Sequence, residues 1–171
     1  MHRIKCCLYE KKYSDALMIV LPSDHIIKNN EIFIDYLSEA CNIAKESDRI
    51  VTIGIQPNYP ETCYGYIHFN PDMRMRRGFA VKSFVEKPTL EIAKEYLDSG
   101  EYYWNSGMFI WKLSTIMESF HKYMPELHTG LIKIYSDLGT ENEHSTLKNI
   151  FSNFKAVSID YGILEKAKSI F

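Results

Sequence analysis

Two short apolar runs on either side of a helix-like segment constrain the fold of this chain most strongly. Residues 17–21 (LMIVL) and 49–55 (RIVTIGI) each stop close to a proline, and such runs are typical of strands buried on both faces of a parallel sheet. Between them, apolar residues recur at helical spacing over 31–46, with Asn29 or Asn30 available as the N-cap. Strand, helix and strand in this order predict a βαβ unit with a right-handed crossover, and therefore an α/β fold.

The rest of the chain predicts further strands and helices. Strands are expected over residues 64–69, 79–86 and 103–111, the last interrupted at 105–107, and a polar, basic loop is expected over 70–78. Helices are expected over 4–12, over 89–99 between Thr89 as cap and Gly100, over most of 113–154 with breaks near Pro125 and Gly139, and from about Asp160 to the last residue.

Composition narrows the class of protein. A length of 171 residues predicts one domain, and 46% hydrophobic residues exclude a wholly disordered chain. Lys and Arg number 20 against 22 Asp and Glu, a balance that gives no support for a nucleic-acid or membrane-surface binder. No apolar run reaches the length of about 18 residues that a membrane span needs. Cys6, Cys7, Cys41 and Cys63 match no metal-site spacing, so free thiols in a reducing cytoplasm are expected.

Four segments at predicted strand ends carry polar groups, and open α/β sheets bind ligands outside the carboxyl ends of their strands. In the first, 21–25 (LPSDH), Asp24 could hold Mg²⁺, with capping of the next turn as the alternative. His25 there is interpreted as a packing or hydrogen-bonding residue. In the second, 60–66 (PETCYGY), Gly65 permits a positive φ or a close backbone approach to a ligand, and a simple turn leading into a strand is the alternative.

The third and fourth segments could recognise a sugar phosphate. In 84–88 (FVEKP), the side chains of Glu86 and Lys87 point to opposite faces if the backbone stays extended. Glu86 could accept hydrogen bonds from sugar hydroxyls and Lys87 could neutralise a phosphate, with a solvated charge pair as the alternative. In 103–109 (YWNSGMF), Asn105 offers both a donor and an acceptor to a sugar hydroxyl, while the flanking aromatic residues equally suit a core.

Taken in this order, the segments resemble the mannose-1-phosphate guanylyltransferase family, also called GDP-mannose pyrophosphorylases. The residues that carry the resemblance are 20–25 (VLPSDH), 53–55 with 60–67, 84–88 (FVEKP), 104–109 (WNSGMF) and 158–166 (SIDYGILEK). The resemblance implies a Rossmann-like nucleotide-diphospho-sugar transferase fold, three-layered α/β/α with a mixed sheet, here incomplete. Residues 1–171 would form a single partial catalytic domain, cut at both ends.

The resemblance also implies a reaction and roles for particular residues. The reaction is nucleotidyl transfer from GTP to mannose 1-phosphate, giving GDP-mannose and pyrophosphate with Mg²⁺ as cofactor. The implied roles are Mg²⁺ binding for Asp24, substrate binding for Glu61, Tyr64 and Gly65, binding of mannose hydroxyls for Glu86, of the phosphate for Lys87 and of the sugar for Asn105. Asp24 and Lys87 would be the catalytic pair, and Asp160 lies in a family motif without an assigned role.

Departures from the family pattern leave other readings open. Family members typically have Gly at the position of Cys63, and their glycine-rich nucleotide loop and second metal-binding Asp do not occur in these 171 residues. We therefore expect no turnover from this stretch alone, and association through an exposed sheet edge with itself or with another chain. The alternatives are a nucleotidyltransferase for another sugar 1-phosphate, and a non-catalytic homologue that binds a sugar phosphate or a partner chain.

Overall fold

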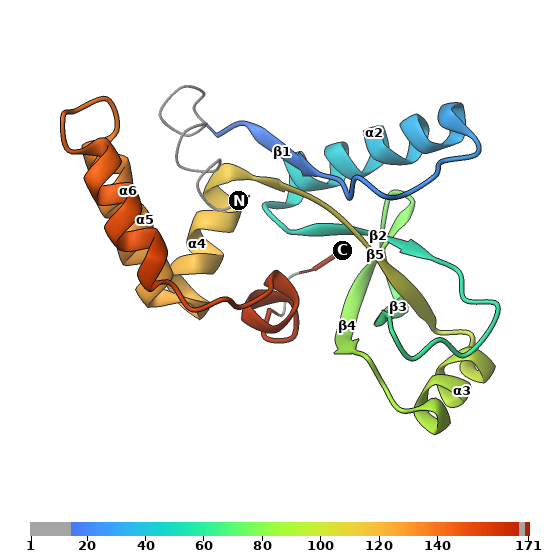
Figure 1. Cartoon of the computed structure of the whole chain (residues 1–171). Helices are drawn as coiled ribbons and strands as arrows, with labels where there is room; N and C mark the ends of the chain where they lie inside the picture. Colours follow the sequence, from blue (N-terminus) through green and yellow to red (C-terminus); the bar gives the residue numbers. More distant parts are fainter. Residues whose placement is uncertain (1–14, 168–169) are drawn as a thin grey trace.

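The computed structural model describes residues 15–167 and 170–171 (Figure 1). The helix expected over 4–12 lies outside them. In chain order the elements are β1 (Leu17–Val20), α2 (Asn30–Ser47), β2 (Val51–Ile55), β3 (Gly65–Met75), β4 (Gly78–Glu86), α3 (Leu90–Ser99), β5 (Tyr102–Lys112), α4 (Leu113–Tyr123), α5 (Pro125–Asp137), α6 (Glu143–Asn153) and the short π-helix η1 (Asp160–Leu164).

The long strand β5 organises the sheet. β1, β2 and β3 all pair antiparallel with β5, and β4 pairs antiparallel with β3. Both Val20 of β1 and Thr52 of β2 are registered against Phe109, so β1 and β2 lie on opposite edges of β5. The order strand, helix, strand is confirmed, and β1 and β2 run in the same direction because both are antiparallel to β5. The parallel sheet expected around them is wrong, because the antiparallel strand β5 lies between them.

β1 is also less buried than its apolar sequence predicts. It is at one end of the strand order of the described sheet, and Ile19 and Leu21 are 42% and 43% exposed. Burial on both faces is therefore wrong for this strand. Association through an exposed sheet edge stays a prediction.

The β3–β4 hairpin is longer than the sequence suggests. The loop predicted over 70–78 is wrong, because β3 continues to Met75 and the turn consists of Arg76 and Arg77. The pairing shifts between Asn70 and Arg74. This irregularity accommodates Pro71, which has no N–H to donate to a ladder.

The helix ends that were predicted from capping and helix-breaking residues are confirmed. The side chain of Asn29 accepts the Ile32 N–H at the start of α2. Thr89 caps α3, and Gly100 ends it with a left-handed φ of 70°. The breaks expected near Pro125 and Gly139 separate α4, α5 and α6.

Two expectations near the end of the fold need correction. β5 continues through residues 105–107, but it bulges there: Thr52 and Gly54 of β2 are registered against Phe109 and Asn105, and Gly107 has a φ of 70°. The helix expected from Asp160 to the last residue stops at Leu164. Instead of continuing a helix, Ile170 forms a parallel bridge with Ile50.

Successive side chains of β5 pack against helices on opposite faces of the sheet, which gives the fold three layers. Ile110 belongs to a core cluster with Ile43 and Ala44 of α2, whereas its neighbours Phe109 and Trp111 belong to a cluster built on α4, α5 and η1. Successive side chains of a strand point to opposite faces, so α2 covers one face of the sheet and α4 with η1 the other. This confirms the α/β/α layering implied by the resemblance.

No helix in the described part of the chain is long and apolar enough to cross a membrane. Cys41 and Cys63 are free thiols, as expected, whereas Cys6 and Cys7 lie outside the described residues. Burial raises the pKa of the Cys41 thiol, which keeps it in the less reactive protonated form.

Candidate functional site

Four elements bring the predicted sugar-phosphate residues together. Gly65 at the start of β3 is registered against Glu86 at the end of β4. Asn105 of β5 donates a hydrogen bond to Asp160, the first residue of η1. The electrostatic influence of both Glu86 and Lys87 on Asp160 places these groups in one cluster.

Glu86 and Lys87 form an ion pair, with 2.9 Å between Lys87 Nζ and Glu86 Oε1. The sequence predicted opposite orientations for an extended backbone, but Lys87 has a left-handed φ of 49°, which lets the two side chains meet. The Glu86 side chain is only 11% exposed and that of Lys87 is 58% exposed. The hydrogen bond from Lys87 to Glu86 raises the pKa of Lys87. A nearly buried carboxylate thus holds an accessible ammonium group that can bind a phosphate.

Gly65 provides room for the Glu86 carboxylate. A Cβ atom on Gly65 would lie 2.5 Å from Glu86 Oε2 and 2.9 Å from Phe84 Cζ. Glycine is therefore required here by a close side-chain approach within the protein, a reason that the sequence alone does not reveal. The main chain adds a further link, because the Lys87 N–H donates to the Tyr64 carbonyl oxygen at 3.2 Å.

Both ends of the Asn105 amide are engaged. Its Oδ1 accepts the Gly107 N–H at 3.1 Å and the Thr52 hydroxyl at 3.4 Å. Its Nδ2 donates to Asp160 Oδ1 at 3.2 Å. These contacts fix the rotation of the amide, and a fixed amide presents its remaining hydrogen-bonding capacity to a ligand in one orientation.

Asp160 is the site residue that sequence reasoning left without a role. Burial, and then the nearby negative charge of Glu86, raise the pKa of Asp160, while Lys87 opposes the shift. The side chain that accepts from Asn105 is therefore also coupled electrostatically to the Glu86–Lys87 pair. The motif at 158–166 was the only sequence signal for it.

We expect Asp160→Asn to leave the fold intact and to flatten the pH dependence of its stability. A carboxyl whose pKa is raised on folding binds more protons in the folded state between its unfolded pKa, about 3.9, and its higher folded pKa. The free energy of unfolding therefore falls as the pH rises through that window. Asn lacks this titration but still offers an oxygen to Asn105. Urea unfolding from pH 4 to pH 8 measures the effect, with the exposed Asp72→Asn as control; an unchanged slope for Asp160→Asn would contradict it.

The segment that precedes β3 is held by its own side chains. The Glu61 carboxylate accepts the N–H groups of Thr62 and Cys63 at 2.8 and 2.9 Å, and the hydrogen bonds, that from Cys63 first, lower the pKa of Glu61. Tyr64 is exposed and lies edge-on to Trp104, with ring centroids 5.5 Å apart. Glu61 thus shapes the turn, and the exposed Tyr64 ring borders the site.

Asp24 lies on a different loop, after β1. This loop reaches β5, since Pro22 lies 3.5 Å from the position of a Cβ atom on Gly107. Asp24 and His25 are exposed, and the described residues contain no group of three or more potential ligands that could hold a metal. They therefore do not build an all-protein metal cage. Mg²⁺ commonly binds one or two carboxylates together with substrate phosphates, and Asp24 fits that mode.

Comparison with known proteins adds an independent line of support. Residues 4–147 match the family model described as nucleotidyl transferase. The xanthan biosynthesis protein XanB of Xanthomonas campestris pv. campestris (strain B100) is 40% identical over 153 residues, covering 89% of this chain and 32% of that protein. The mannose-1-phosphate guanylyltransferase of Escherichia coli (strain K12) is 38% identical over 157 residues, covering 90% and 33%. The chain thus spans about a third of the length of these curated relatives.

Two solved structures superpose on this fold. A crystal structure described as mannose-1-phosphate geranyltransferase from Thermus thermophilus superposes with a TM-score of 0.84 at 31% identity, covering 98% of this chain and 47% of that one. One described as mannose-6-phosphate isomerase from Helicobacter pylori superposes with a TM-score of 0.79 at 25% identity, covering 99% and 66%. The fold expected from the motifs is confirmed by both.

Proposed function

Because the chain belongs to the nucleotidyl transferase family, we propose that the protein carrying this domain transfers a nucleotidyl group from GTP to mannose 1-phosphate. The observation that carries the proposal is the exposed Lys87 ammonium on the nearly buried Glu86, beside the fixed amide of Asn105. A cation next to oriented polar groups suits a sugar phosphate. The relatives named mannose-1-phosphate guanylyltransferase support GTP and mannose as the specific partners.

In the proposed reaction, a phosphate oxygen of mannose 1-phosphate attacks the α-phosphorus of GTP. A new phosphorus–oxygen bond forms, the bond to the bridging oxygen of the leaving group breaks, and pyrophosphate departs with that electron pair. Lys87 would offset the charge of the sugar phosphate, while Glu86 and Asn105 would hold the sugar hydroxyls. Positioning and charge stabilisation are the main contributions that proteins make to such transfers.

Asp24 is the residue that we assign to Mg²⁺. When bound, the cation would neutralise phosphate charge in the transfer. Asp160 would act on the sugar through Asn105 and is therefore a positioning residue. Glu61, Tyr64 and Gly65 would form the border of the substrate site.

The test is pyrophosphate release by the protein that carries this domain, with GTP and either mannose 1-phosphate or glucose 1-phosphate. Turnover with mannose 1-phosphate supports the proposal. Turnover only with another sugar phosphate would favour the alternative sister enzyme. Binding of mannose 1-phosphate by calorimetry without any turnover would favour the non-catalytic homologue.

We expect Asp24→Asn to raise the Mg²⁺ concentration needed for half-maximal activity by about tenfold. The amide keeps the shape of the side chain but loses the negative charge that a hard cation prefers. Titration of activity with Mg²⁺ measures the shift, and Asp98→Asn at the exposed end of α3 is the control. A folded Asp24→Asn protein with the same Mg²⁺ dependence would return Asp24 to its alternative role in the turn.

A further inference from the structure

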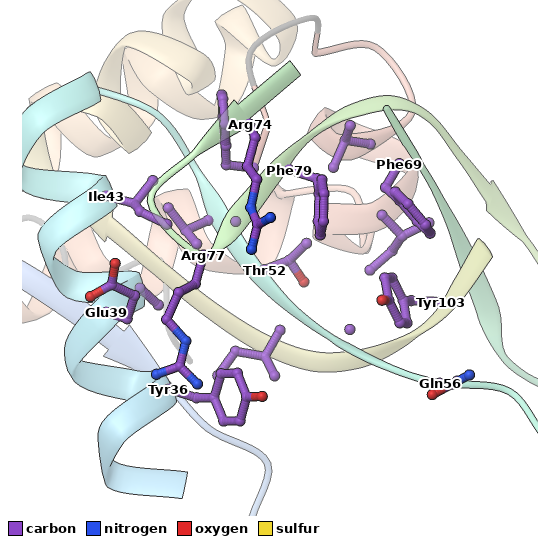
Figure 2. Close-up of a pocket in the computed structure, with 18 of the residues that line it drawn as sticks. Tyr36, Glu39, Ile43, Thr52, Gln56, Phe69, Arg74, Arg77, Phe79 and Tyr103 are labelled. Carbon is purple, nitrogen blue, oxygen red and sulfur yellow. The ribbon is translucent and has the colours of Figure 1, made fainter. Parts of the chain in front are cut away.

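Two hollows lie on opposite sides of the sheet. The one shown in Figure 2 lies between α2 and the β3–β4 hairpin, with Ile43 and Phe79 among its walls. The other lies among α4, α5, α6 and η1, and its volume is about 750 Å³. Small-molecule sites commonly have volumes of about 300–1,000 Å³ and often lie between helices. This second hollow, the helical cavity, therefore has the size and the setting of a ligand site.

The helical cavity has apolar walls. Leu127 at the start of α5 is 4% exposed. The half-buried apolar side chains of the lining include Met124, Ile150, Phe154 and Val157. Their partial burial leaves apolar surface that a ligand can cover, and covering such surface stabilises a complex by about 25 cal/mol for each Å². A ligand with an apolar body is therefore favoured.

The charged residues of the lining are exposed and form its rim. They are Glu126, Lys155 and Lys166, so two cations face one carboxylate. The described lysines that form ion pairs are Lys82, Lys87, Lys112 and Lys133. Within the described residues, Lys155 and Lys166 thus have no ion-pair partner, and their surplus of positive charge is complementary to an organic anion.

The helical cavity also borders the element that carries Asp160. Figure 1 shows η1 between the helices α4–α6 and the sheet, and η1 contacts both α4 and β4. Gly162 of η1 lines the cavity, and a Cβ atom on Gly162 would lie 2.6 Å from Met124 Sδ. Met124 therefore packs directly on η1.

The turn that Met124 touches is the turn that holds Asn105. Glu165 N–H donates to Asp160 O at 3.0 Å, which closes one hydrogen-bonded turn around Gly162. At its start, Asp160 Oδ1 accepts from Asn105 Nδ2 at 3.2 Å. Short π-helical turns of this kind are frequent at functional sites. A ligand that packs on Met124 thus reaches the candidate site through a single turn.

We propose that the helical cavity binds a small organic anion with an apolar body, and that the bound ligand shifts Asp160 through η1. The apolar body packs on Met124 and Phe154, and the anionic group lies at the rim with Lys155 and Lys166. A ligand changes a structure only through contacts that differ between two arrangements. Met124 supplies them, because its flexible side chain repacks against the ligand and so changes its contact with η1.

Naphthalene carboxylate is the probe, with naphthalene carboxamide as its neutral counterpart of nearly the same shape. A heteronuclear NMR titration of the whole chain follows the backbone amides of Leu127 and Gly162, which report binding. The side-chain amide of Asn105 reports the shift of η1. We expect all three signals to move with one dissociation constant, and the carboxamide to bind about three- to tenfold more weakly, since exposed ion pairs are individually modest.

A pair of double variants tests the charge. Lys155→Gln with Lys166→Gln should weaken binding of the carboxylate by about three- to tenfold and leave binding of the carboxamide unchanged. Lys28→Gln with Lys94→Gln removes the same charge from two exposed lysines outside the lining and should leave both constants unchanged. All four substitutions are on exposed side chains, so the variants keep the fold.

Three results would overturn the proposal. An absence of saturable shifts at Leu127 and Gly162 would remove the ligand site. Equal binding of the carboxylate and the carboxamide, or by the two double variants, would remove the anion from it. Binding without a shift of the Asn105 side-chain amide would remove the link to Asp160. None of these measurements requires catalysis, so they do not depend on the proposed function.

Discussion

Glu86→Ala should lower kcat/KM for mannose 1-phosphate by about 30- to 1000-fold, which corresponds to about 2–4 kcal/mol of transition-state stabilisation. Two losses combine in this variant. The sugar hydroxyls lose a charged acceptor, and Lys87 loses the carboxylate that holds its Nζ at 2.9 Å. Steady-state kinetics on the protein that carries this domain measure the change.

Two variants separate the site from general damage to the fold. Glu86→Gln keeps the size and one acceptor oxygen, and we expect a smaller loss. Glu101→Ala removes another carboxylate that contacts the hairpin, through His68 at 3.0 Å and Lys82 at 3.3 Å, and should leave kcat/KM unchanged. Equal kinetics for Glu86→Ala and the unchanged protein would remove Glu86 from the substrate site.

Helix boundaries were predictable because neighbouring residues set them. The Thr89 side chain caps α3 by a contact three residues away, and Gly100 ends the helix through its own left-handed backbone. Strand pairing has no such local signal. β5 lies between β1 and β2 although it follows both of them in the chain, so alternation and apolarity predicted the strands but not their neighbours.

For the site too, local sequence predicted which residues take part, whereas long-range contacts determine how they are arranged. The segments around Glu86 and Asn105 could be selected from residue chemistry and from the resemblance. Their geometry could not, because Lys87 adopts a left-handed φ that favours glycine or asparagine. The contact of Asn105 with Asp160 joins residues 55 positions apart. No periodicity in the sequence brings such a pair together.

Gly65→Ala should destabilise the fold by about 1–3 kcal/mol, the usual cost of overpacking, and should also reduce kcat/KM nearly as much as Glu86→Ala. The added Cβ would meet Glu86 Oε2 at 2.5 Å and Phe84 Cζ at 2.9 Å. Both distances require a shift, and because Phe84 is buried in the core, the larger shift falls on the Glu86 carboxylate at the end of its flexible side chain. Its displacement breaks the geometry of the pair with Lys87.

A double-mutant cycle identifies that cause. In a Glu86→Ala background, Gly65→Ala should lower kcat/KM by no more than about twofold further, because neighbours that share one mechanism are not additive. Gly130→Ala supplies matched crowding away from the site, since its Cβ would lie 2.5 Å from the Phe154 ring, and it should cost stability without changing kcat/KM. Fully additive losses from Gly65→Ala and Glu86→Ala would mean that Gly65 acts on catalysis through the backbone of β3 and not through the room it leaves for Glu86.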